Sequence, residues 1–158
     1  RSPAYLERLN APTDWTQQMA PAFQDFQRGA CRCTASEGAG LGGVVLALRF
    51  NLDGPADKAR IDSGRLIADA TAAEGISAAH IGLCEHAITD VETRERAARS
   101  ATGENRYDAV FLVEGMSHAE LQATRAVLVK RAVAAFAGHA LAHAEIYDLA
   151  FALRESDL

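Results

Sequence analysis

Apolar residues alternate with small or polar ones along four segments of the chain and recur at helical spacing in between. The alternating segments, 44–52, 78–89, 107–114 and 144–153, predict strands. The segments with helical spacing, 57–74 and 118–137, predict two long helices. From residue 43 onward the expected order is therefore strand, helix, strand, strand, helix, strand, with a polar helical stretch at 91–102 inserted after the second strand.

Local signals mark the ends of both long helices. Asp57 is a candidate cap for the first helix, and Gly75 is expected to end it. Ser117 and Glu120 have the spacing of a capping box at the start of the second. This second helix is expected to place four apolar side chains on one face: Leu121, Leu128, Ala132 and Phe136.

Alternation also sorts the strand residues onto two faces. The bulky face of the first strand, with Val44, Leu46, Leu48 and Phe50, suits covering helices. The opposite face is small, polar and rich in histidine. It is expected to carry Arg49, His80, Cys84 and His86.

The element order from residue 43 to 153 resembles the dimeric α+β barrel superfamily, in which two ferredoxin-like units join their sheets. This superfamily includes antibiotic-biosynthesis monooxygenases, muconolactone isomerases, ethyl-tert-butyl-ether-degradation-type proteins and polyketide cyclases. The resemblance implies an α+β fold with a ferredoxin-like βαββαβ domain, a homodimer through the sheet face and an enclosed small-molecule site. We expect residues 43–158 to form this domain and residues 1–42 to form an N-terminal helical extension with a Gly-rich linker.

The extension is expected to be helical through residue 35, with Trp15, Met19, Phe23 and Phe26 forming one aromatic stripe. The linker contains the glycines of 38–43, which invite comparison with a nucleotide-binding loop. A dinucleotide fingerprint follows a strand and opens a helix. Because this segment is expected to follow a helix and open a strand, we interpret it as a hinge or a close backbone approach.

Charge and composition narrow the possible partners. The net charge of −5, without a basic stripe, argues against a nucleic-acid partner. No apolar run approaches the ~20 residues that span a bilayer, so no membrane partner is expected. The first thirty residues are polar and are interrupted by Pro3, Pro12 and Pro21, unlike a secretory signal, so we expect a cytoplasmic protein.

His80 and His86 are the candidate catalytic residues, because histidine exchanges a proton near neutral pH. A metal shared by the two is not expected: six residues of strand span ~20 Å, whereas ligands of one ion lie within ~4 Å of each other. Arg49 has two interpretations: a clamp for an anionic substrate group, or a structural residue that pairs with Glu114 or Asp148 or extends to the rim of the sheet. The candidate substrate-binding residues are Arg49, Cys84, Glu114, Tyr147 and Asp148.

The leading functional hypothesis is a small-molecule enzyme of lyase, isomerase or cofactor-free oxygenase (monooxygenase) type. The expected substrate is a hydrophobic metabolite, aromatic and carboxylated compounds included. The enzyme is expected to need no cofactor. One alternative is a non-catalytic small-molecule-binding or accessory protein. A second alternative is a haem-binding or haem-degrading protein, in which His80 or His86 would be the axial ligand.

Overall fold

The computed structural model describes residues 3–22, 27–39, 41–53, 62–100, 106–136 and 140–150 of the 158-residue chain. The chain divides into two compact units, each made of two segments. Unit 1 comprises Arg1–Ala30 and Glu85–Tyr107, and unit 2 comprises Cys31–Cys84 and Asp108–Leu158.

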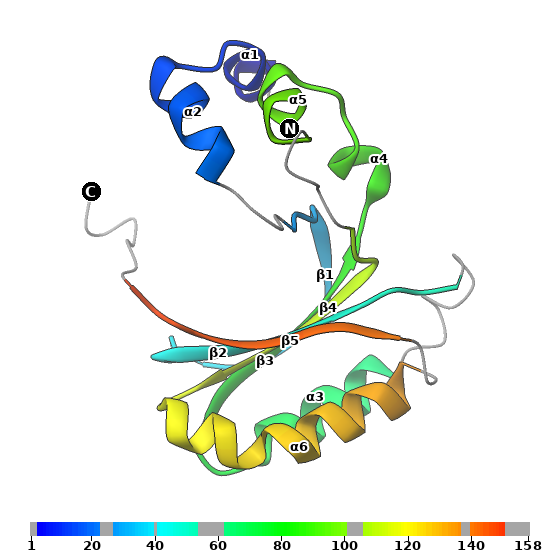
Figure 1. The fold of residues 1–158 in the computed structure, drawn as a ribbon. Helices are drawn as coiled ribbons and strands as arrows, with labels where there is room; N and C mark the ends of the chain where they lie inside the picture. Colours follow the sequence, from blue (N-terminus) through cyan, green and yellow to red (C-terminus); the bar gives the residue numbers. More distant parts are fainter. Residues whose placement is uncertain are drawn as a thin grey trace. The chain divides into compact units, whose positions relative to one another are not determined.

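Unit 2 is an α+β structure with a five-stranded sheet in the order β1-β3-β4-β2-β5, in which all neighbouring strands are antiparallel. Because β4 lies between β2 and β3, those two strands run parallel and are connected across β4 through α3. Helices α3 and α6 lie on the same side of the sheet (Figure 1). The elements are β1 (Cys31–Gly38), β2 (Val44–Phe50), α3 (Ser63–Thr71), β3 (Ile76–Cys84), β4 (Ala109–Gly115), α6 (His118–Ala135) and β5 (Leu141–Asp148).

The hydrophobic core lies between this helical layer and the sheet. The bulky face expected for β2 is confirmed, since Leu46, Leu48 and Phe50 are all fully buried. The apolar face expected for α6 is also confirmed: its four residues from Leu121 to Phe136 are buried. Phe136 stacks on Phe50 with ring centroids 4.1 Å apart, so the end of α6 is fixed against the end of β2.

The helix ends largely follow the sequence signals. The Ser117 hydroxyl accepts a hydrogen bond from the Glu120 amide at 3.3 Å and donates one to the Glu120 carboxylate at 2.9 Å. At the start of α3 the capping residue is Asp62, whose carboxylate accepts from the Arg65 amide at 3.2 Å. The predicted cap Asp57 lies outside the described residues.

Two predictions of secondary structure are wrong. Residues 31–38, expected to belong to the helical extension and the linker, form strand β1, which pairs with β3 along its whole length. The strand expected at 78–89 ends at Cys84 and is followed by a short helix, α4 (His86–Thr89). The helix predicted in the insertion is confirmed as α5 (Arg94–Ser100). The last strand, predicted at 144–153, is β5, which begins at Leu141 and ends at Asp148. Residues 149–150 belong to no strand, and 151–153 lie outside the described residues.

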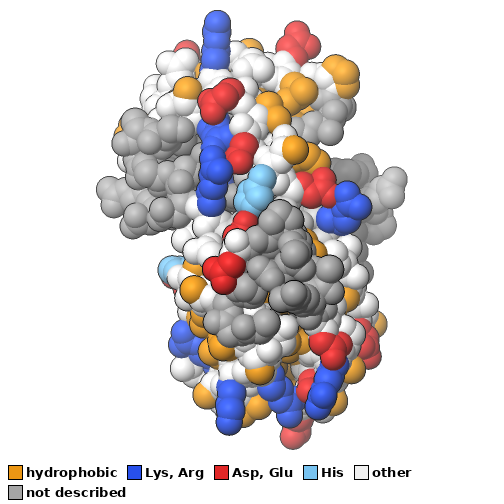
Figure 2. All heavy atoms as spheres, turned by 90° about the vertical axis from the view of Figure 1, so that its right-hand side faces the viewer, with side chains coloured by type: hydrophobic (Ala, Val, Ile, Leu, Met, Phe, Trp, Pro, Cys, Tyr) orange, Lys and Arg blue, Asp and Glu red, His pale blue; other side chains and the backbone are white. Residues whose placement is uncertain are grey.

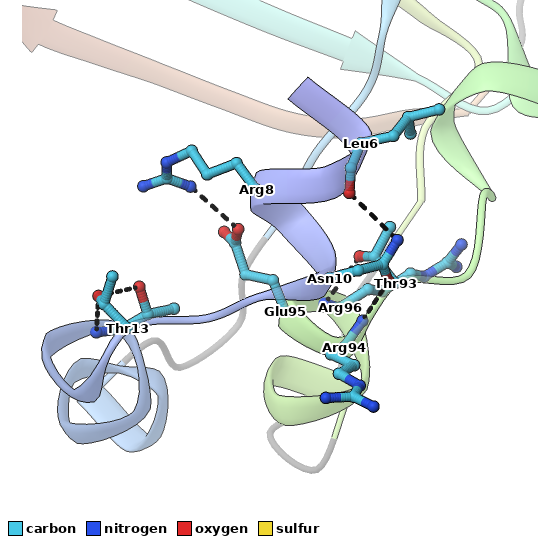
Figure 3. A network of polar contacts seen from close by, with 9 residues as sticks. Leu6, Arg8, Asn10, Thr13, Thr93, Arg94, Glu95 and Arg96 are labelled. Carbon is cyan, nitrogen blue, oxygen red and sulfur yellow. Dashed lines mark hydrogen bonds and ion pairs between the residues drawn. The ribbon is translucent and has the colours of Figure 1, made fainter. Parts of the chain in front are cut away.

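Unit 1 joins α1 (Pro3–Asn10), α2 (Asp14–Met19) and the short η1 (Ala20–Ala22) to α4 and α5. The Asn10 side chain accepts from the Arg94 amide at 3.2 Å, and Arg8 pairs with Glu95 at 3.6 Å (Figure 3). Trp15 of the expected aromatic stripe is 66% exposed. Phe23 and Phe26 lie outside the described residues.

Charges of both signs are interspersed on the outer surface of the helical layer of unit 2 (Figure 2). Within the described residues, every helix is too short or too polar to cross a bilayer.

Truncation of one core residue of α6 tests this packing. Leu128→Ala is expected to lower the free energy of unfolding by about 2–5 kcal/mol, because it leaves a cavity between α6 and the sheet. The matched control is Val127→Ala on the same helix, where the side chain is 53% exposed and a change within about 0.5 kcal/mol is expected. Urea denaturation measures both, and equal losses would contradict the packing described.

Candidate functional site on the second face of the sheet

The face of the sheet that α3 and α6 do not cover, here called the second face, carries most of the polar strand residues. Strand register arranges its side chains in rows that run across the sheet. One row is Ser36, His80, Leu112, Ala47 and Glu145. The neighbouring row, two residues away along each strand, contains Gly82, Val110, Arg49 and His143.

His80 is held at both ring nitrogens. Its Nδ1 atom lies 2.7 Å from the Ser36 hydroxyl on β1, and its Nε2 atom lies 3.2 Å from the Glu114 carboxylate on β4. The His80 side chain is 30% exposed and that of Glu114 is 23% exposed, so solvent or a ligand reaches both. We call Ser36, His80 and Glu114 the His80 cluster.

The protonation of neutral His80 follows from its two partners. An ionised carboxylate only accepts hydrogen bonds, so Nε2 carries the proton and donates it to Glu114. Nδ1 then has a free electron pair that accepts the Ser36 hydroxyl proton. In this tautomer the electron pair of the imidazole faces Ser36, and the N–H group at Nε2 faces the Glu114 carboxylate.

The Glu114 carboxylate is itself fixed by the glycine-rich segment. Its second oxygen accepts a hydrogen bond from the Gly42 amide at 2.9 Å. A Cβ atom at position 42 would lie 2.7 Å from the Gly115 carbonyl oxygen and 2.9 Å from the Glu114 Cβ. Only glycine brings its amide this close, so the close backbone approach expected for this segment is present at Gly42.

A second polar cluster, the Arg49 cluster, connects β2 with β5. Arg49 donates to the Tyr147 hydroxyl at 3.1 Å, and its guanidinium carbon lies 5.8 Å from the centre of the Tyr147 ring. Tyr147 donates to the Glu145 carboxylate, whose other oxygen lies 2.6 Å from His143 Nε2. Arg49 therefore takes Tyr147 as a hydrogen-bond partner, where Glu114 or Asp148 had been expected as its carboxylate.

These contacts shift two pKa values in opposite directions. The Tyr147 hydrogen bond is the main cause of a lowered pKa of Glu145, with smaller contributions from His143 and Arg49. Burial is the main cause of a raised pKa of Tyr147, and the Glu145 hydrogen bond adds to it. Both shifts favour a neutral phenol that donates to an ionised carboxylate.

His80 and Arg49 are not in contact, although the sequence predicts a direct contact between Arg49 and one of the two candidate histidines. Strand β4 lies between their strands, so two interstrand spacings of ~4.8 Å put them ~10 Å apart sideways. The cross-strand neighbour of Arg49 is His143. Apolar side chains, Leu112 and Val110 among them, occupy the surface between the clusters.

A pocket of about 290 Å³ lies at the sheet end next to the His80 cluster. Glu114 and Gly42 contribute to its wall, so the carboxylate that binds His80 also borders this space. The remaining lining residues are mostly apolar: Leu41, Val44, Val45, Leu112, Asp148, Leu149 and Ala150.

Three other predicted site residues belong to neither cluster, although Asp148 lines the same pocket as Glu114. His86 is the first residue of α4 in unit 1 and does not lie on the strand of His80. Asp148 pairs across strands with Val44 of the helical face, and its carboxylate lies 3.8 Å from His118 on α6. Cys84 is buried at the end of β3, 2.9 Å from the sulfur of Cys31.

Ser36 was missed because it was assigned to a linker. The signal that could have revealed β1 is the alternation of Cys31, Cys33 and Ala35 with polar residues. Those three side chains are small, so the pattern is weak. Among the described residues, no group of three histidine, cysteine or acidic side chains is placed to hold a metal ion.

The fold and the two clusters define an α+β protein with a histidine-centred polar site on one face of an antiparallel sheet. The chain matches no protein-family model and no curated protein.

Substitution of Tyr147 tests the Arg49 cluster. Tyr147→Phe removes the hydrogen bond to Glu145, so the pKa of Glu145 should rise toward its ordinary value. In the wild type, the lowered pKa stabilises the fold above the unfolded-state pKa of Glu145, and this contribution is lost as pH falls through the folded-state value. Carboxyl ¹³C NMR titration measures the shift. Tyr5→Phe on α1 is the control, and an unchanged Glu145 titration in Tyr147→Phe would contradict the assignment.

Proposed function

We propose that this protein is a small-molecule enzyme of lyase or isomerase type in which His80 is the general acid/base. The observation that carries the proposal is the position of His80 between the Ser36 hydroxyl at Nδ1 and the Glu114 carboxylate at Nε2. A histidine held in place by two partners can act as general acid and base in proton transfer to and from carbon. No covalent nucleophile is needed for such a reaction.

Each residue has a distinct role in this proposal. His80 Nδ1 takes a proton from the substrate, and Ser36 either passes that proton on or moves aside for the substrate. Glu114 orients the ring and stabilises the imidazolium by its negative charge. Arg49 binds an anionic group of the substrate, where its planar guanidinium suits a carboxylate.

The spacing of the clusters indicates the size of substrate that fits. Arg49 and His80 lie two interstrand spacings (~10 Å) apart sideways and two residues (~6.6 Å) apart along the strands, which puts them ~12 Å from each other. The apolar side chain of Leu112 lies in the intervening strand. A compound with an aromatic or aliphatic body and a carboxylate at one end would span this distance. Its acidic C–H bond would then lie at His80 while its carboxylate lay at Arg49.

Hydrogen exchange at carbon tests the proposal even while the product of the reaction is unidentified. The protein is incubated in D₂O with a panel of small carboxylated carbon acids, and mass spectrometry detects deuterium gained by each compound. The wild type is expected to accelerate exchange of at least one compound. His80→Ala is expected to slow that exchange by about 10²- to 10⁴-fold, the usual contribution of a general acid/base.

The control is His118→Ala, which removes an exposed histidine on α6 and should leave the exchange rate unchanged. Circular dichroism and thermal melting establish that each variant is folded. If folded His80→Ala exchanges the same proton at the wild-type rate, the assignment to His80 is wrong. A non-catalytic binding protein or a haem protein would accelerate no exchange in this panel.

We further propose that unit 2 is a ferredoxin-like domain that pairs with a second copy through the second face, as in a dimeric α+β barrel. The support is the strand order, in which β4 separates the parallel strands β2 and β3. A second copy would enclose the His80 and Arg49 clusters and exclude water from them. Electrostatic contacts are stronger in such an environment.

Sedimentation velocity at micromolar concentration tests the dimer. The wild type is expected to sediment as a dimer, and Leu112→Glu as a monomer, because the variant adds a charge to the second face next to His80. Val127→Glu, on the exposed side of α6, is the matched control and should remain dimeric. A wild-type protein that is a stable monomer at this concentration would contradict the proposal.

A further inference from the structure

Cys31 and Cys84 face each other across β1 and β3. They are direct cross-strand partners, and their sulfur atoms lie 2.9 Å apart. Both are thiols in the structure. A disulfide has a sulfur–sulfur length of about 2.05 Å, so bond formation requires the two sulfurs to approach by less than ~1 Å.

The backbone arrangement around the pair suits a cross-strand bond. The Glu85 amide donates to the Ala30 carbonyl at 2.9 Å, so the pair next to the cysteines is hydrogen bonded. Residues directly opposite each other alternate between hydrogen-bonded and non-hydrogen-bonded pairs in an antiparallel ladder. Cys31 and Cys84 therefore form a non-hydrogen-bonded pair, in which side chains come closest, with Cα atoms ~4.5 Å apart.

Gly82 gives the Cys31 side chain its room. A Cβ atom at position 82 would lie 2.9 Å from Cys31 Cβ and 3.1 Å from Val110 Cγ1. Any larger residue there would displace Cys31, so the glycine keeps the two sulfurs in contact. Cys33, two residues along β1, is exposed, and its sulfur lies 3.4 Å from the carbonyl oxygen of Ala35.

We propose that Cys31 and Cys84 are a redox-active pair that small disulfides such as oxidised glutathione convert into an intramolecular disulfide. The Cys31 thiolate, which is partly exposed, attacks oxidised glutathione, forms a mixed disulfide and releases one glutathione thiolate. The Cys84 thiolate then attacks the Cys31 sulfur and releases the second. Two protein thiols are oxidised, one glutathione disulfide is reduced to two thiols, and the two protons pass to the released thiolates. The inference does not depend on the proposed function.

Mass spectrometry after trypsin digestion tests the pair directly. Arg32 lies between Cys31 and Cys33, so cleavage there puts these two cysteines on different peptides. Reduced wild-type protein is incubated with oxidised glutathione, the remaining thiols are alkylated, and the digest is analysed without reduction. We expect a Cys31–Cys84 linked peptide pair as the main product.

The matched control is Cys33→Ser, which should form the same bond at the wild-type rate. Cys31→Ser and Cys84→Ser should form none. Thermal melting gives an independent reading: the oxidised wild type and oxidised Cys33→Ser should melt about 5–15 °C above their reduced forms, because the bond restricts the unfolded chain. Cys31→Ser should show no such increase.

Three results would overturn the proposal. The first is accumulation of the glutathione adduct at Cys31 without transfer to Cys84. The second is a bond between Cys31 and Cys33 as the main product. The third is a disulfide between two chains, seen on a non-reducing gel, in place of the intramolecular bond.

Discussion

The structure of unit 2 depends on the packing of two helices against a single face of its sheet. Leu48 and Phe50 are fully buried in that contact, and Phe136 at the end of α6 closes it by stacking on Phe50. Because successive side chains of a strand point to opposite faces, the residues next to those that pack against the helices point to the second face. Burial of Ala79 and Ile81 thus determines where His80 points.

Much of this arrangement was accessible from the sequence. The order of the strands and helices of unit 2 other than β1, the buried face of α6 and the capping box at Ser117 were predicted and are confirmed, since each depends on local periodicity or local hydrogen bonding. The strand ends were predicted less well, since β3 ends at Cys84 and β5 at Asp148. The same reasoning put His80 on the face away from the helices. The sequence did not predict its partner Ser36, because an edge strand with small and polar side chains has almost no apolar pattern.

The remaining differences come from strand pairing and chain turns, which periodicity does not encode. His86 lies an even number of residues after His80, so in a continuous strand both side chains would point to the same face, and alternation alone would extend the strand through His86. The chain instead turns at Glu85, whose carbonyl accepts from the Ile88 and Thr89 amides and starts α4. Likewise, only the sheet order reveals that β4 separates Arg49 from His80 and gives Arg49 a different histidine neighbour, His143.

The two-segment composition of unit 1 has a consequence for the order of events during protein synthesis. Helices α1 and α2 are made early, yet their partner α5 belongs to the segment Glu85–Tyr107, which follows β3. At roughly 5–20 residues per second, several seconds pass before the ribosome supplies that partner. During this interval Asn10 lacks Arg94 and Arg8 lacks Glu95. Unit 1 is therefore completed only after β1, β2 and β3 have been synthesised, although α1 and α2 precede all three strands in the chain.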